Sequence, residues 1–118
     1  MTSPFELTEE LIAESRVLVV DDDELVTNSL RSFLSLEVDI DPIVFNESPR
    51  AAAYLRENDF DLIISDFLMP QMDGIQLLSE ARKARPEVSR VLLTGYADKE
   101  NAIKAINEVQ VFQYIEKP

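Results

Sequence analysis

The stretch that decides the fold is VLVVDDDE, residues 17–24, in which an aliphatic run leads directly into a run of acids. A continuous apolar run of this length is too short for a helix and is typical of a strand buried on both faces of a parallel sheet. Like charges placed side by side repel one another in a folded protein unless a partner compensates them. We therefore expect a central strand over residues 17–20, followed by acids that face a cation.

Similar apolar runs recur along the chain, separated by segments with helical periodicity. The runs cover residues 17–20, 42–45, 62–65, 91–93 and 111–115, and the helical segments cover residues 24–36, 48–58, 74–84 and 98–109. This alternation of strand and helix predicts an α/β fold with right-handed crossovers. We expect a doubly wound, flavodoxin-like parallel sheet of five strands in the order 2-1-3-4-5, with the fifth strand at an edge.

Single residues predict the helix boundaries and the buried helix faces. Ser48 followed by Pro49 is typical of an N-cap and a first helical position. Asp73 before a glycine is expected to form a turn and to cap the helix that begins there. The inward-facing positions expected for residues 24–36 are Val26, Leu30, Phe33 and Leu34.

The two ends of the chain differ from its regular interior. Ser3 and Glu6 form a potential capping box, so we expect residues 1–15 to be an N-terminal helical extension and residues 16–118 to be the folded domain. The sequence stops directly after the fifth expected strand. We therefore expect the fifth helix of such a fold to be missing from this chain, and a longer parent chain to supply an output domain.

Composition narrows the chemistry that the chain can perform. A net charge of −12 argues against direct binding to nucleic acid or to an anionic membrane, because both need a basic face. The chain has no cysteine and no histidine, which excludes disulfides, thiol chemistry and imidazole metal ligands. The N-terminus is acidic and has no signal-peptide core, and we expect a cytoplasmic location.

Polar and charged side chains follow several of the expected strands. Asp21 and Asp22 follow the first strand, Asp66 follows the third, Thr94 ends the fourth and Lys117 follows the fifth. In a doubly wound sheet of this order, ligands bind at the carboxyl ends of strands 1 and 3. We therefore expect these five side chains to meet at one edge of the sheet.

Converging carboxylates predict a bound cation. Because only oxygen ligands are available, the ion is expected to be hard, and Mg²⁺ suits a few carboxylates, a carbonyl group and waters. Such a site keeps coordination positions that a phosphate oxygen can fill. An aspartate beside the ion can then act as a nucleophile and take a phosphoryl group as an acyl phosphate.

Four motifs together resemble the receiver domain of two-component response regulators over residues 16–118. They are VLVVDDDE, DLIISDFLMPQMDG, VLLTGYAD and YIEKP, in this order and at suitable spacing. The stretch from Leu92 to the end is similar to receivers joined to cyclic-dinucleotide phosphodiesterases or to hydrogenase-type transcriptional regulators. The resemblance implies a regulatory domain rather than an enzyme, with self-catalysed phosphorylation and dephosphorylation.

The resemblance also implies residue roles at the metal and phosphoryl sites. Asp66 is expected to be the phosphoacceptor, receiving its phosphoryl group from a sensor histidine kinase or a phosphotransfer protein. Asp21 and Asp22 are expected to hold Mg²⁺ with Asp66, and Asp22 to be the more direct ligand of the pair. The backbone carbonyl of Leu68 would complete the protein ligands.

The remaining roles concern the switch that follows phosphorylation. Thr94 and Lys117 are expected to contact the phosphoryl group, and the bond before Pro118 to be cis. As Thr94 moves toward the phosphoryl group, Tyr114 would swing between exposed and buried positions. The changed face would then bind a partner or a second copy of the chain, which is compatible with a homodimer.

Three other interpretations compete with this one. In a haloacid-dehalogenase-type phosphatase, Asp21 would be the nucleophile and Asp23 the acid/base, but no later acidic metal-binding motif follows Lys117. A pseudo-receiver would keep the fold without phosphorylation, against the intact set of acids. A calcium loop starting at Asp21 would need a glycine at its sixth position, where Val26 stands.

Overall fold

The computed structural model of the chain describes residues 15–95, residue 100 and residues 113–116. Its strands are β1 (Val17–Val20), β2 (Ile43–Phe45), β3 (Leu62–Asp66), β4 (Ser89–Thr94) and β5 (Gln113–Glu116), and its helices are α2 (Glu24–Val38), α3 (Ser48–Glu57) and α4 (Gly74–Ala84). The expected extension over residues 1–15 lies almost wholly outside the described residues. Among the helices that are described, none is long and apolar enough to cross a membrane.

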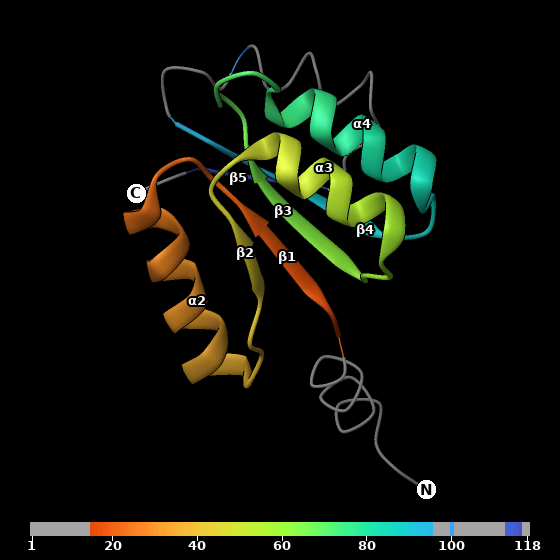
Figure 1. Cartoon of the computed structure of the whole chain (residues 1–118). Coiled ribbons are helices and arrows are strands. Elements are labelled where there is room, and N and C mark those ends of the chain that lie inside the picture. The colour runs from red at the N-terminus through yellow and green to blue at the C-terminus, as the bar shows by residue number, and fades with distance from the viewer. Residues whose placement is uncertain (1–14, 96–99, 101–112, 117–118) are drawn as a thin grey trace, which may run out of the picture.

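All five strands lie in one parallel sheet in the order β2-β1-β3-β4-β5, which confirms the predicted topology (Figure 1). Helix α2 covers one face of the sheet, and helices α3 and α4 lie together on the other face. Strands β1, β3 and β4 are buried over almost their whole length, as continuous apolar runs predict. Strand β5 pairs with β4 at an edge of the sheet, as expected.

The core divides into two layers because successive residues of a strand point to opposite faces. Leu18 and Val20 of β1 pack toward helices α3 and α4, with Leu77 and Leu78 of α4 fully buried against them. Val17 and Val19 pack on the other face in the cluster that contains Leu34 of α2. Helices anchored on both faces hold the strand ends, and therefore the loops that follow them, in fixed positions.

The expected burial of Phe33 is wrong. Its side chain is 58% exposed, whereas Leu34 beside it is 9% exposed. The buried face of α2 follows Thr27, Leu34 and the half-buried Leu30, which are spaced three and four residues apart. One residue turns a helix by about 100°, so Phe33 lies away from this face.

The expected N-cap role of Ser48 is also wrong by one residue. Helix α3 begins at Ser48 itself, with Pro49 in its first turn as predicted, and Glu47 is the N-cap. The carboxylate of Glu47 pairs with Arg50 at 2.8 Å. The hydroxyl of Ser48 instead donates a hydrogen bond across to the carbonyl of Pro70 at 3.3 Å. Its side chain therefore joins two loops.

The cap of α4 is as predicted, and α2 also begins with an aspartate as its N-cap. Asp23 accepts from the backbone N–H of Leu25 at 2.9 Å and starts α2. Asp73 accepts from the N–H of Gln76 at 2.8 Å, and the Gln76 side chain accepts from the N–H of Asp73 at 2.9 Å. This reciprocal capping box satisfies two of the backbone donors that every helix start leaves without a partner.

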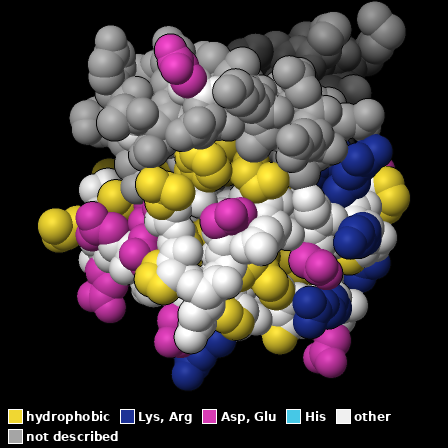
Figure 2. Space-filling view, turned by 90° about the horizontal axis from the view of Figure 1, so that it is seen from above, with side chains coloured by type: hydrophobic (Ala, Val, Ile, Leu, Met, Phe, Trp, Pro, Cys, Tyr) yellow, Lys and Arg dark blue, Asp and Glu magenta, His cyan; other side chains and the backbone are white. Residues whose placement is uncertain are grey.

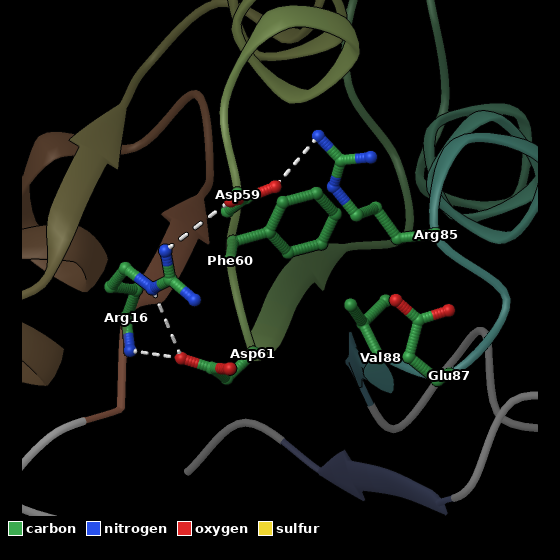
Figure 3. A pocket seen from close by; sticks show the side chains of 7 residues that line it. All are labelled: Arg16, Asp59, Phe60, Asp61, Arg85, Glu87 and Val88. Carbon is green, nitrogen blue, oxygen red and sulfur yellow. Dashed lines mark hydrogen bonds and ion pairs between the residues drawn. The ribbon is translucent and has the colours of Figure 1, made fainter.

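At the amino ends of the strands, ionic contacts join three loops around a pocket of about 300 Å³ (Figure 3). Arg16, directly before β1, pairs with Asp59 at 3.8 Å and with Asp61 at 3.3 Å. Arg85, directly after α4, pairs with Asp59 at 2.9 Å. Asp59 therefore bridges two arginines from distant parts of the chain.

Replacing Asp61 with asparagine is expected to lower stability in a pH-dependent way. The backbone N–H of Arg16, 2.7 Å from Asp61 Oδ2, lowers the pKa of this carboxyl group, and the Arg16 side chain adds to the effect against the opposing effect of burial. A lowered pKa stabilises the fold above about pH 4 and this contribution is lost as the pH falls through the folded-state pKa. We expect Asp61→Asn to cost about 1 kcal/mol at pH 7, because the half-exposed pair is screened by solvent.

Urea unfolding at pH 7 and pH 3 tests this expectation, with Asp41→Asn as the control at an exposed acid. The difference between the wild type and Asp61→Asn should shrink at pH 3. An equal difference at both pH values would mean that the asparagine acts through packing rather than through charge.

Candidate functional site

Three of the predicted acids meet at the carboxyl end of the sheet. Asp21 and Asp22 follow β1, and Asp66 is the last residue of β3. Strands β1 and β3 are parallel neighbours, with Val20 opposite Ser65, so their ends lie side by side. One carboxylate oxygen from each of the three acids lies within 4.8 Å of the others. Figure 2 views this edge of the sheet, where acidic side chains lie among hydrophobic and uncharged ones.

The three acids differ in their exposure to solvent. Asp21 is completely buried, Asp66 is 6% exposed, and Asp22 is exposed. The Oδ1 atom of Asp21 accepts a hydrogen bond from the backbone N–H of Asp23 at 2.9 Å, which orients this carboxylate. A buried carboxylate needs hydrogen bonds or a cation to offset its desolvation. This cluster, which we call the acid pocket, therefore has two buried acids, Asp21 and Asp66, and one acid that is open to solvent, Asp22.

The arrangement fits a hard divalent cation. Any two oxygens bound to one octahedral Mg²⁺ ion lie at most about 4.2 Å apart, and the three carboxylate oxygens here lie within 4.8 Å of one another, so small side-chain movements would let all three reach one ion. The donors are all oxygen, as such an ion prefers. The residues that could hold it are Asp21, Asp22 and Asp66. Leu68 lies two residues beyond Asp66 in the loop before α4, and its side chain is 56% exposed.

Thr94 lies at the same edge of the sheet. It is the last residue of β4, its side chain is completely buried, and Asp66 is opposite Leu93 in the neighbouring strand. The Thr94 hydroxyl donates to the carbonyl of Gly95 at 3.1 Å, a local contact.

The other predicted site residues are described only in part. Tyr114 lies in β5, where its backbone is opposite Leu92 of β4. The predicted position of its ring is a side-chain property outside the described structure. Lys117 and Pro118, with the predicted cis bond between them, also lie outside the described residues.

Two residues that contact the site were missed by the sequence reasoning. Asn46 donates from its side-chain Nδ2 to the carbonyl of Asp21 at 2.8 Å. Gly74 packs so closely on the end of β3 that a methyl group there would lie 2.9 Å from the carbonyl carbon of Asp66. Asn46 follows the second predicted strand directly, which places it at the same edge as the acids. That position was the signal that could have identified it.

The geometry also bears on the phosphatase alternative. Asp23, its proposed acid/base, is the N-cap of α2 and accepts from the N–H of Leu25. Asp21, its proposed nucleophile, is completely buried and bonded to the backbone of the same loop. Asp66 belongs to the cluster although that scheme assigns it no role. The arrangement therefore does not follow the residue roles of the phosphatase scheme.

Comparison with known proteins gives consistent matches. The family model described as the response regulator receiver domain matches residues 17–118. The hydrogenase transcriptional regulatory protein HoxA of Cupriavidus necator is 34% identical over 105 residues, covering 89% of this chain and 21% of HoxA. The regulatory protein VanRB of Enterococcus faecalis is 32% identical over 103 residues, covering 87% of this chain and 46% of VanRB.

A solved structure agrees with the fold. The CheY-like response regulator receiver domain protein from Methanospirillum hungatei superposes with a TM-score of 0.79 at 31% identity, covering 88% of this chain and 82% of that one. The chain spans less than half the length of HoxA and of VanRB. The match to HoxA confirms the similarity to hydrogenase-type regulators. By its matched residues, its sheet order and its relatives, the chain belongs to the response regulator receiver domain family.

Proposed function

We propose that the chain is a phosphoacceptor signalling domain in which Asp66 receives a phosphoryl group with the help of Mg²⁺. The observation that carries this proposal is the meeting of Asp21, Asp22 and Asp66 at the ends of two parallel strands. These three side chains and the carbonyl of Leu68 are proposed to hold the ion. The domain would be regulatory, catalysing its own phosphorylation and dephosphorylation.

The proposed reaction is a phosphoryl transfer to a carboxylate. One oxygen of Asp66 attacks the phosphorus of a phosphohistidine, forming a P–O bond while the P–N bond of the donor breaks. The electron pair leaves with the imidazole, which takes up a proton. The bound cation would neutralise charge on the phosphoryl oxygens. Lys117 is proposed to pair with those oxygens.

The proposed output is a change of surface near β4 and β5. A phosphoryl group adds almost two negative charges and several acceptor oxygens. We propose that the Thr94 hydroxyl exchanges the carbonyl of Gly95 for one of these oxygens, and that Tyr114 moves into the space that Thr94 leaves. The local character of the present Thr94 bond supports this exchange. The phosphoryl group favours the active state only through its stronger contacts there.

The proposed partners follow from the family. Receiver domains interact with histidine kinases and with output domains, and HoxA and VanRB are both longer than this chain. We propose a sensor histidine kinase or a phosphotransfer protein as the phosphodonor, and an output domain in a longer parent chain as the effector. A homodimer formed through the changed face is part of the same proposal.

Intact-mass measurement after incubation with acetyl phosphate and Mg²⁺ tests the proposed function. The mass of the wild type should rise by one phosphoryl group, and hydroxylamine should remove the label because an acyl phosphate is cleaved by it. Chelation of Mg²⁺ before the addition of acetyl phosphate should slow labelling at least tenfold, because the repulsion between the carboxylates and the donor is then uncompensated. A label that forms equally fast with chelator, or that resists hydroxylamine, would contradict the proposal.

A further inference from the structure

The loop that joins β2 to α3 contacts the acid pocket, although none of the predicted ligands lies in it. Asn46, the first residue after β2, donates from Nδ2 to the carbonyl of Asp21 at 2.8 Å and to the hydroxyl of Thr27 at 3.1 Å. The N–H of Asp21 donates in turn to the carbonyl of Phe45 at 3.1 Å. The backbone N–H and the backbone carbonyl of Asp21 are therefore both hydrogen-bonded to residues at the end of β2.

The same loop also contacts the segment that follows Asp66. The hydroxyl of Ser48 donates to the carbonyl of Pro70 at 3.3 Å, and the Ser48 side chain is 2% exposed. Pro70 lies four residues beyond Asp66, in the loop that carries Leu68. Asn46 and Ser48, two positions apart, thus hold the two loops that supply the proposed Mg²⁺ ligands. We call this pair the β2–α3 clamp.

A cavity lies between the loop after β1 and the loop after β3, which the bonds of the clamp connect. The cavity measures about 170 Å³ and is lined by Asp22, by Met69, Pro70 and Gln71 of the loop after β3, and by the β2–α3 segment from Asn46 to Ser48. Where a cavity separates two loops, direct packing does not fix the distance between them. The hydrogen bonds of the clamp connect the two loops at this side of the pocket, in addition to the pairing of β1 with β3 that precedes both loops.

We propose that Asn46 and Ser48 are positioning residues that set the affinity of the acid pocket for Mg²⁺. The inference rests on the proposed function, because it assigns the clamp to the metal site of that function. Asn46 fixes the backbone of Asp21 and the first turn of α2, and Ser48 fixes the loop after Asp66. Residues that orient metal ligands typically change affinity by about ten- to one-hundredfold when they are replaced.

Calorimetric titration of the full chain with MgCl₂ tests the clamp. Asn46→Ala is expected to raise the Kd for Mg²⁺ about tenfold, and Ser48→Ala to raise it by about threefold because its bond is longer. The rate of labelling by acetyl phosphate should return to the wild-type value at saturating Mg²⁺. Such a recovery separates a loss of affinity from a loss of the reacting carboxylate.

The controls use bonds of the same kind away from the pocket. Asn58 donates from Nδ2 to the carbonyl of Tyr54 at 3.0 Å, and Ser29 donates to the carbonyl of Leu25 at 2.8 Å. Asn58→Ala and Ser29→Ala should leave the Kd for Mg²⁺ unchanged, and their effects on stability in urea should be small because both bonds are exposed to solvent.

The outcomes separate the clamp from the proposed function. In one outcome, the wild type binds Mg²⁺ and is labelled while both clamp variants keep a Kd within twofold of the wild-type value. That result would contradict the proposed role of the clamp and leave the proposed function standing. If the wild type neither binds Mg²⁺ nor takes a phosphoryl group, the proposed function is wrong, and the role of the clamp, which rests on it, is wrong as well. Should Asn46→Ala not fold, as judged by circular dichroism, Ser48→Ala alone decides, since it removes only an oxygen atom.

Discussion

Asp66→Asn is expected to abolish labelling by acetyl phosphate, so that the mass of the variant stays unchanged under conditions that convert the wild type. The amide of asparagine has no charged oxygen with which to attack phosphorus, and it cannot form an acyl phosphate. The substitution keeps the size of the side chain at a position that is 6% exposed. We therefore expect the fold to remain and the loss of labelling to exceed one-hundredfold, in line with removal of a nucleophile.

The matched control for this variant is Asp73→Asn. Asp73 lies seven residues further along the same β3–α4 segment and caps α4 through the N–H of Gln76. Asparagine is as good an N-cap as aspartate, so this variant should fold and be labelled like the wild type. Undiminished labelling of Asp66→Asn would assign the phosphoryl group to another residue. In that case peptide mapping of the labelled chain would identify the residue.

Asp66→Asn also has an effect that does not depend on phosphorylation. The variant replaces one of three clustered carboxylates by a neutral amide. In the absence of Mg²⁺, the repulsion between these acids falls, and we expect the stability of the apo form to rise by about 1 kcal/mol. Urea unfolding without and with Mg²⁺ checks this: the wild type should gain more stability from the ion than the variant does.

The sequence predicted the part of the fold that depends on hydrophobic pattern. Continuous apolar runs over β1, β3 and β4 identified strands buried on both faces, and the strand order followed from the topology rules for such sheets. The meeting of Asp21 with Asp66 could also be predicted, because a parallel sheet brings the carboxyl ends of neighbouring strands to one edge. This reasoning needs only strand positions, which the pattern supplies.

The features that the sequence did not reveal depend on angles and on contacts between loops. Phe33 was misplaced because it and its neighbour Leu34 are both apolar and both continue the helical pattern of α2, and the packing buries only Leu34. Ser48 was taken for an N-cap because its hydroxyl is a common helix cap, whereas the fold uses it to reach Pro70. The hydrogen bonds of Asn46 could not be predicted, since its two acceptors lie 25 and 19 positions away in the chain and only its position directly after the second strand indicated that it lies near the acids.

The second large effect is expected from Gly74, the first residue of α4. The N–H of Gly74 donates to the carbonyl of Phe67 at 2.8 Å, which draws the start of the helix against the end of β3. A Cβ atom at this position would overlap the carbonyl oxygen of Asp66 and would lie 3.1 Å from the Cδ1 atom of Leu92. The overlap is with backbone, which no change of side-chain rotamer can relieve. The lack of a side chain at position 74 is therefore required for this close approach.

Gly74→Ala should destabilise the chain by about 3 kcal/mol and lower Tm by roughly 10 °C. Helix propensity alone predicts a gain in stability instead, since alanine is favoured over glycine by about 1 kcal/mol within a helix. The sign of the measured change therefore decides between the two effects. Because relief of the overlap must move either α4 or the backbone of Asp66, we also expect slower labelling by acetyl phosphate at temperatures where the variant is folded.

Ser79→Ala is the control, because it makes a small substitution in the same helix at a half-buried position. Alanine has the higher helix propensity there as well, so the stability should stay within about 0.5 kcal/mol of the wild type or rise slightly. Thermal unfolding of the three proteins, followed by circular dichroism, gives the comparison. A Gly74→Ala variant that is as stable as Ser79→Ala would show that the helix start can move away from Asp66 without cost. The position of Asp66 would then have to be fixed by β3 and its pairing with β4 rather than by contact with α4.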